Sequence, residues 1–61
     1  MTLKELRVSY NLSQKQLSIK SGLSINTIQA LEQGKRDLAK MKMENLKKLM
    51  IVFGNDILKL I

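Results

Sequence analysis

The stretch that most constrains the fold of this chain is SQKQLSIKSGLSINTIQALEQG, residues 13–34. Its first residue, Ser13, can cap a helix, and Gln16 three residues later completes an S-x-x-Q capping box. In such a box each side chain accepts a hydrogen bond from the other residue's backbone N–H, so two free donors at the helix start are satisfied. These residues predict a helix over residues 14–21, with Leu17 as its clearest core residue.

A tight turn and another helix are predicted directly after this one. Gly22 stands where a helix must end in the left-handed conformation, which costs glycine almost nothing. Leu23 plugs the turn, and Ser24 can cap a helix over residues 25–33. The apolar residues that point this helix back at the first are spaced three apart: Ile28 and Leu31.

Length and composition favour an all-α fold. The chain has 61 residues, enough for one small domain over residues 1–61. A chain of this size buries only about 60% of its unfolded surface. It contains no cysteine, so we expect no disulfide and no cysteine–histidine zinc site. It shows no cofactor motif, so we expect no cofactor and no bound metal. Its β-branched residues do not alternate with polar ones, which argues against a sheet. We expect a compact bundle of about five short helices.

The flanking segments supply the remaining helices. Thr2 and Glu5 form another capping box, at the start of a helix over residues 2–10. A helix over residues 42–53 is predicted from an apolar stripe at helical spacing: Leu46, Leu49, Met50 and Phe53. Gly54 should end it, with Asn55 or Asp56 capping a last helix over residues 57–61. The side chains expected to dock that helix on the core are Ile57, Leu60 and Ile61, whereas Leu58 points elsewhere and suits a subunit contact.

These features resemble the helix-turn-helix of the phage repressor and Cro family, also called XRE or lambda-repressor-like. The resemblance rests on Leu17, Ser18, Gly22, Leu23, Ile28 and Leu31, followed by Glu32-Gln33-Gly34-Lys35-Arg36. It extends over nearly the whole chain, because the flanking segments resemble the family's first, fourth and fifth helices. Ser18 departs from the alanine common at its position. The segment after Arg36 is a few residues longer than usual and lacks the family's frequent proline.

The resemblance implies that the third helix reads DNA. Asn and Gln side chains can make bidentate bonds to adenine, while Ile or Ala can touch a thymine methyl group. Gln14, at the start of the second helix, matches a position that often touches DNA in this family. The residues expected to contact bases are Gln14, Ile25, Asn26, Gln29 and Ala30. The alternative is that they form an ordinary polar helix face.

Charge supports a nucleic-acid partner. Eleven Lys and Arg residues against five acids give a net charge of +6, which favours a polyanion. Such an excess alone is more often a solubility device, but beside a helix-turn-helix it indicates DNA. The family places phosphate contacts in the loop after the third helix. The residues expected to contact phosphate are Ser24, Thr27, Gln33, Lys35, Arg36 and Lys40.

Arg7 has two interpretations. It could reach a phosphate, or it could turn inward and pair with an acid. The resemblance favours the inward position, because an arginine at this place commonly pairs with the glutamate matching Glu32. We therefore expect a structural ion pair between Arg7 and Glu32.

The leading hypothesis is a sequence-specific double-stranded DNA-binding protein, a small repressor-like transcriptional regulator that binds a palindromic operator as a homodimer. The alternative is a protein-interaction module, such as an antitoxin that neutralises a partner protein and can bind its own promoter. A membrane-surface peptide over residues 46–61 is disfavoured by the capped helices upstream. Without His or Cys, and with scattered acids, we expect no enzyme. With no export signal or long apolar run, we expect a cytoplasmic location without membrane contact.

Overall fold

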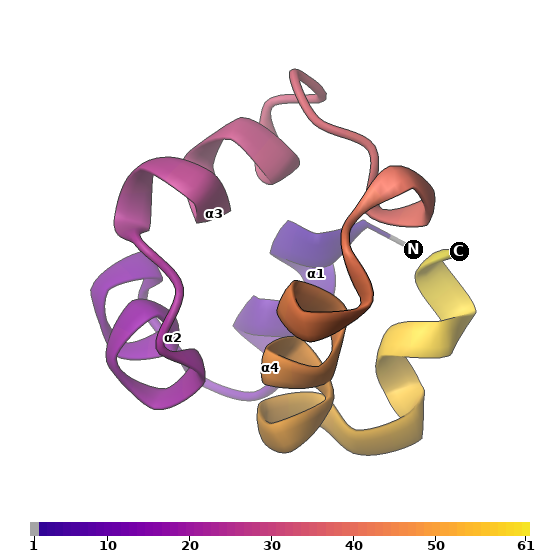
Figure 1. Ribbon diagram of the computed structural model, residues 1–61. Coiled ribbons are helices and arrows are strands. Elements are labelled where there is room, and N and C mark those ends of the chain that lie inside the picture. Colours follow the sequence, from indigo (N-terminus) through magenta and orange to yellow (C-terminus); the bar gives the residue numbers. More distant parts are fainter. Residues whose placement is uncertain (1) are drawn as a thin grey trace.

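The computed structural model describes residues 2–61 and shows a helical bundle (Figure 1). Its four α-helices span Leu3–Ser9 (α1), Gln14–Ser21 (α2), Ile25–Glu32 (α3) and Met43–Phe53 (α4), and its two 3-10 helices span Leu38–Lys40 (η1) and Gly54–Leu60 (η2). Residues 2–61 contain no strand. The expected all-α fold is therefore confirmed, and the predicted bounds of the first three helices are correct to within one residue.

Side-chain caps begin the first three helices, as predicted. Thr2 and Glu5 form the capping box of α1, and Ser13 and Gln16 form that of α2. In the second box the Ser13 hydroxyl accepts from the Gln16 N–H at 3.0 Å, and the Gln16 side chain accepts from the Ser13 N–H at 2.8 Å. Ser24 caps α3 by accepting from the backbone N–H three residues later, at 3.2 Å. Local polar bonds therefore fix where each helix starts.

The turn between α2 and α3 has its backbone groups bonded by two serines. Gly22 has φ +79°, and no neighbouring atom would obstruct a Cβ there, so the conformation alone favours glycine. The Ser18 hydroxyl donates to the Leu23 carbonyl at 2.6 Å, and the Ser21 hydroxyl accepts from the Leu23 N–H at 3.2 Å. The serine that replaces the family's usual alanine thus bonds the turn.

The core lies where all the helices meet. Its buried apolar residues are Leu3, Leu6, Leu17, Leu23, Ile28, Leu31, Leu49, Phe53 and Ile57. Four of them, Leu17, Ile28, Leu49 and Ile57, are fully buried and come from α2, α3, α4 and η2 respectively. Burying a side chain of this size contributes about 2 kcal/mol. Because α3 places Ile28 and Leu31 in this core, its opposite side faces outward.

The segment between α3 and α4 differs from the prediction. It contains η1, which the sequence pattern did not predict, and Asp37 caps it by accepting from the Ala39 N–H at 3.0 Å. α4 begins at Met43, one residue later than expected, and the Lys42 side chain makes no cap bond. The apolar stripe of α4 is present, with Leu49 and Phe53 buried and the other two members half-buried.

The C-terminal segment also corrects the prediction. Gly54 ends α4 but starts η2 at once, and neither Asn55 nor Asp56 caps it. Asp56 is instead occupied by Tyr10, whose hydroxyl donates to Asp56 Oδ2 at 2.7 Å. That hydrogen bond, more than the Lys59 charge, lowers the pKa of Asp56. Ile61 is 55% exposed, so its expected docking is wrong, while Ile57 is buried and Leu60 packs against the core.

Candidate nucleic-acid interface

The outward face of α3 begins with an apolar side chain beside an amide. Ile25 is 38% exposed and Asn26 is also exposed. The cap fixes this end of the helix, because the Ser24 hydroxyl lies 2.9 Å from the Thr27 hydroxyl as well as bonding its N–H. An exposed Ile beside an Asn suits a surface that carries both a methyl group and hydrogen-bonding groups.

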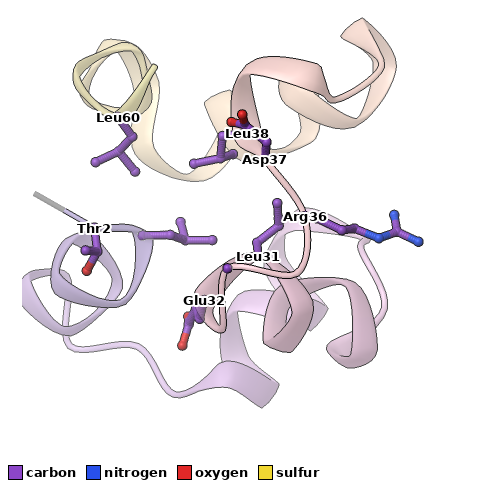
Figure 2. A pocket seen from close by; sticks show the side chains of 9 residues that line it. Thr2, Leu31, Glu32, Arg36, Asp37, Leu38 and Leu60 are labelled. Carbon is purple, nitrogen blue, oxygen red and sulfur yellow. The ribbon is translucent and has the colours of Figure 1, made fainter.

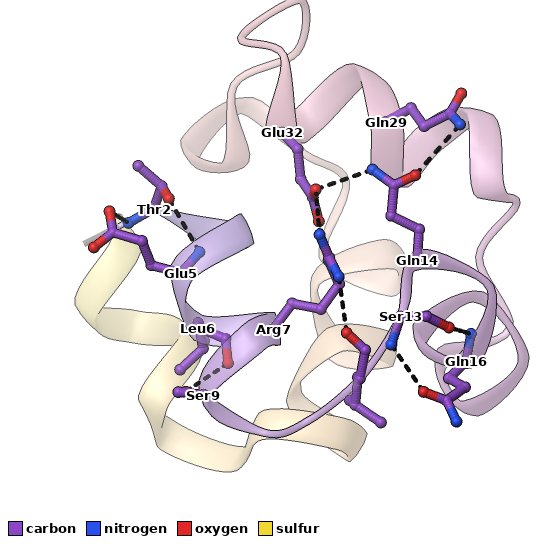
Figure 3. Close-up of polar contacts among 11 residues, drawn as sticks. Thr2, Glu5, Leu6, Arg7, Ser9, Ser13, Gln14, Gln16, Gln29 and Glu32 are labelled. Carbon is purple, nitrogen blue, oxygen red and sulfur yellow. Dashed lines mark hydrogen bonds and ion pairs between the residues drawn. The ribbon is translucent and has the colours of Figure 1, made fainter.

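The remaining residues expected to contact bases are less exposed. Gln29 and Ala30 are half-buried one turn further along α3, whereas Gln33, which is expected to contact phosphate, is exposed at the end of the helix. Gln14 is half-buried at the start of α2. The structure brings Gln14 against Gln29, whose Nε2 donates to Gln14 Oε1 at 3.4 Å (Figure 3). Four of the five base-contact candidates thus lie on α3, and the fifth is bonded to one of them.

Beneath this face lies the ion pair between α1 and α3. Arg7 Nε donates to Glu32 Oε2 at 2.7 Å and Nη2 donates to Oε1 at 3.1 Å, so the pair is bidentate. The third contact of the guanidinium is the Leu12 carbonyl, at 2.8 Å. The two charged side chains are only 11% and 4% exposed. The expected inward position of Arg7 is therefore present, and its guanidinium is occupied by protein groups.

Glu32 also accepts a bond from α2. Gln14 Nε2 donates to Glu32 Oε1 at 3.0 Å (Figure 3). Burial raises the pKa of Glu32, but the hydrogen bonds from Arg7 and Gln14 and the charges of Arg7 and Lys4 outweigh it, so the pKa is lowered. The family resemblance implied the ion pair, whereas the two glutamine bonds were not predicted from the sequence. No signal in the linear pattern places residue 14 against residues 29 and 32.

The end of α3 is fixed by a Schellman motif. Gly34 has φ +80° and its N–H donates to the Leu31 carbonyl at 3.4 Å. The N–H groups of Lys35 and Arg36 donate to the Ala30 carbonyl at 2.8 and 3.2 Å. Lys35 and Arg36 begin the basic loop, residues 35–42, and these backbone hydrogen bonds hold them against the end of α3.

Leucine side chains hold the inner side of this loop. A hollow next to α1 and η2 is lined by Leu3, Leu31, Leu38 and Leu60 together with Thr2, Glu32, Gly34, Arg36 and Asp37. Figure 2 shows Leu38 pointing into the hollow, whereas the Arg36 guanidinium points away from it. Leu38 packs against the core, as expected for an anchor of the loop. The anchored loop presents Arg36 to solvent.

The outer side of the loop and the start of α4 form a basic groove. Its lining residues are Lys35, Arg36, Asp37, Lys40, Met41, Lys42 and Asn45. Four of the lining residues are basic and one, Asp37, is acidic. The Asp37 side chain caps η1. Lys42 and Asn45 are additions to the residues expected from the sequence. The run of basic residues continuing past Lys40 could have indicated Lys42, whereas Asn45 enters only through the turn made by η1.

Among residues 2–61, no group of three His, Cys, Asp or Glu side chains is placed to hold a metal ion. No helix within the same range is both long and apolar enough to cross a membrane.

A comparison with family models matches residues 3–60 to a helix-turn-helix model. No curated protein and no solved structure matches the chain. The matched range contains α2, the glycine turn and α3, the elements from which the resemblance was inferred. This chain belongs to the XRE-type helix-turn-helix family, the Cro and lambda-repressor-like family of DNA-binding proteins.

Proposed function

We propose that this protein binds double-stranded DNA sequence-specifically, with α3 in the major groove of an operator, and acts as a small repressor-like transcriptional regulator. The observation that carries the proposal is the outward face of α3, where Ile25 and Asn26 are exposed. The other face of the helix is held by its core leucine and isoleucine and by the ion pair of Glu32. A rigid helix with an exposed polar face suits base reading, which requires fixed geometry.

The proposed base contacts follow from side-chain chemistry. The amides of Asn26 and Gln29 can bond adenine N6 and N7, and Ile25 or Ala30 can touch a thymine methyl group. Gln14 lies beside them at the start of α2. These contacts would discriminate among base pairs by about 1–3 kcal/mol each.

The proposed phosphate contacts lie at both ends of α3. Free N–H groups and the helix dipole attract phosphate to its N-terminus, where the hydroxyls of Ser24 and Thr27 lie. Beyond its C-terminus the basic groove supplies long cationic side chains. The full set is Ser24, Thr27, Gln33, Lys35, Arg36 and Lys40, to which the groove adds Lys42 and Asn45.

We further propose that two copies bind a palindromic operator. One small domain buries too little surface for firm specificity, and a twofold dimer doubles it. Leu58 on η2 is 50% exposed although its neighbour Ile57 is fully buried. An outward leucine on the last helix suits a contact between the two copies.

A binding selection from random duplex DNA tests this function. The parent should select a motif, Gln29→Ala should lose preference at one or two base pairs, and Ile25→Ser should lose preference for a thymine. Affinity for unrelated DNA should stay nearly constant, because phosphate contacts supply it. Identical motifs from all three proteins would remove α3 as the base reader.

A second candidate is the binding of a partner protein, as an antitoxin does. It is supported by apolar side chains away from α3, since Ile19 is 72% exposed and Ile51 is 77% exposed. Ile51 and Val52 also line a hollow with Tyr10, Leu12 and Lys20. A parent that selects no DNA motif would place this candidate first.

A further inference from the structure

A chain of hydrogen bonds connects the buried ion pair to the outward face of α3. Glu32 holds Arg7 on one side and accepts from Gln14 Nε2 at 3.0 Å on the other. Gln14 Oε1 in turn accepts from Gln29 Nε2 at 3.4 Å. Figure 3 shows the four side chains in sequence, with the Gln29 amide at the outer end. These hydrogen bonds therefore connect a charged group in the interior to a side chain on the proposed DNA-binding surface.

The carboxylate of Glu32 determines which group donates and which accepts in each of these hydrogen bonds. An ionised carboxylate only accepts hydrogen bonds, so Gln14 must turn its Nε2 toward it. The lowered pKa of Glu32 keeps this carboxylate ionised at neutral pH. A rotated Gln14 amide would place its oxygen against the carboxylate and leave a half-buried donor without its partner, which is costly. The Gln14 oxygen is consequently held toward Gln29.

The same reasoning applies to Gln29. Its Nε2 donates to the Gln14 oxygen, and a rotated amide would set two acceptor oxygens against each other. In the observed orientation Gln29 keeps its Oε1 and its second N–H for other partners. One acceptor beside one donor is the pattern that adenine matches in the major groove through N6 and N7.

We propose that Gln14, held by Glu32, is a positioning residue that fixes the orientation of the Gln29 amide and thereby makes Gln29 selective for adenine. The inference rests on the proposed base-reading function of α3. It assigns Gln14 a different role from a direct base contact, because the amide of Gln14 is engaged by Glu32 and Gln29. Glu32 then has two functions, since it neutralises Arg7 and orients the glutamines.

Gln14→Met tests the positioning role while leaving both charged side chains of the ion pair, Arg7 and Glu32, in place. Methionine keeps the length of the side chain and removes both polar groups. We expect adenine preference at the base pair that depends on Gln29 to fall about five- to tenfold, because the Gln29 amide can then rotate. Affinity for unrelated DNA should change less than about twofold, since phosphate contacts supply it. Ile19→Met is the matched control on the same helix, exposed and without a bond to Gln29, and should keep the parent motif.

A double-variant cycle separates positioning from direct contact. In a Gln29→Ala background, Gln14→Met should cause no further loss of preference, because it acts through Gln29. Equal losses in both backgrounds would show that Gln14 reads a base itself, and equal weakening on all sequences would show a phosphate contact. Either result overturns the inference while leaving base reading by α3 intact. A parent with no selected motif overturns the proposed function, and the inference with it.

A measurement without DNA provides an independent readout. The side-chain amide resonances of Gln29 in a ¹⁵N-correlation spectrum should shift in Gln14→Met and stay unchanged in Ile19→Met. The same spectra show whether each variant is folded. Unchanged Gln29 amide resonances in a folded Gln14→Met protein would contradict the contact on which the inference depends.

Discussion

The segment from Ser13 to Gly34 and the segment from Lys35 to Ile61 are built differently. In the first, both helices have side-chain caps and the turn between them is bonded by serine hydroxyls. In the second, α4 and η2 begin without a side-chain cap. That segment is held mainly by apolar residues such as Leu49 and Ile57. Local polar bonds thus fix residues 13–34, the bonded half, whereas residues 35–61, apart from the Asp37 cap of η1, depend mainly on packing.

This difference matches the proposed roles of the two segments, which are base reading and phosphate contact. Base reading needs donors and acceptors held in a set geometry, and the bonded half contains the outward face of α3. Phosphate contacts tolerate long flexible side chains, because a point charge attracts from many directions. The second half carries the basic groove, with Lys40 and Lys42 on and beside η1.

The largest effect is expected from the ion pair between Glu32, in the bonded half, and Arg7 of α1. Glu32→Ala leaves Arg7 buried without its partner, which should cost about 3 kcal/mol. A domain of this length has about 3–9 kcal/mol in total, so the variant should lose about a third or more of its free energy of unfolding. Urea denaturation followed by circular dichroism measures the difference.

The control for this variant is Glu44→Ala on α4, an exposed acid in the other half, which should change stability by no more than about 0.5 kcal/mol. Acid provides a second check. Because the fold lowers the pKa of Glu32, its contribution is present above about pH 4.5 and is lost as the pH falls through the folded-state pKa. Glu32→Ala should lack this part of the acid dependence. If Glu32→Ala and Glu44→Ala lost similar amounts of stability, the claim that polar bonds matter more in residues 13–34 than in residues 35–61 would be contradicted.

A medium effect is expected from exchanging caps between the halves. Ser24→Ala should cost about 1 kcal/mol, because it frees an N–H at the start of α3. Lys42→Ser should stabilise by about 0.5–1 kcal/mol, since residue 42 has the extended backbone of a cap and lacks only the side-chain acceptor. Lys47→Ser, inside α4, is the control and should destabilise slightly. No gain from Lys42→Ser would mean that the start of α4 is not a weak point.

The smallest effect concerns the loop. Lys35→Ala and Arg36→Ala should each weaken binding to all DNA sequences and reduce the slope of log K against log salt by about 0.9. Lys20→Ala, on α2 and outside the basic groove, is the matched control. Fluorescence anisotropy at several salt concentrations gives the slopes. A change of selected motif with an unchanged slope would move these residues from phosphate contact to base reading.

Sequence patterns predicted the bonded half almost completely. Caps and the glycine turn are local signals, so Ser13, Gly22 and Ser24 could be assigned from spacing alone. The resemblance supplied the pairing of Arg7 with Glu32. The glutamine bonds were missed, because the proximity of α2 and α3 side chains depends on how the two helices pack.

The second half was predicted less well for the same physical reason. η1 is a three-residue turn without a hydrophobic period, and only Asp37 at its start gave a local signal. The last helix was placed after a cap that does not form, since Asp56 bonds the distant Tyr10 instead. Tyr10 also packs edge-on against Phe53, with 4.9 Å between the ring centroids, and remains 40% exposed. Long-range contacts of this kind carry no signal in the sequence pattern.

Nucleotide substitution directly tests whether the outward face of α3 reads bases in the major groove. In the selected site, each adenine is replaced in turn by 7-deazaadenine, which lacks the N7 acceptor and keeps base pairing. The parent should lose about five- to tenfold in affinity at the adenine read by Gln29, and Gln29→Ala should lose almost nothing further there. Asn26→Ala should behave in the same way at a different adenine. Equal losses in parent and variants, or no loss at any adenine, would contradict base reading by this helix.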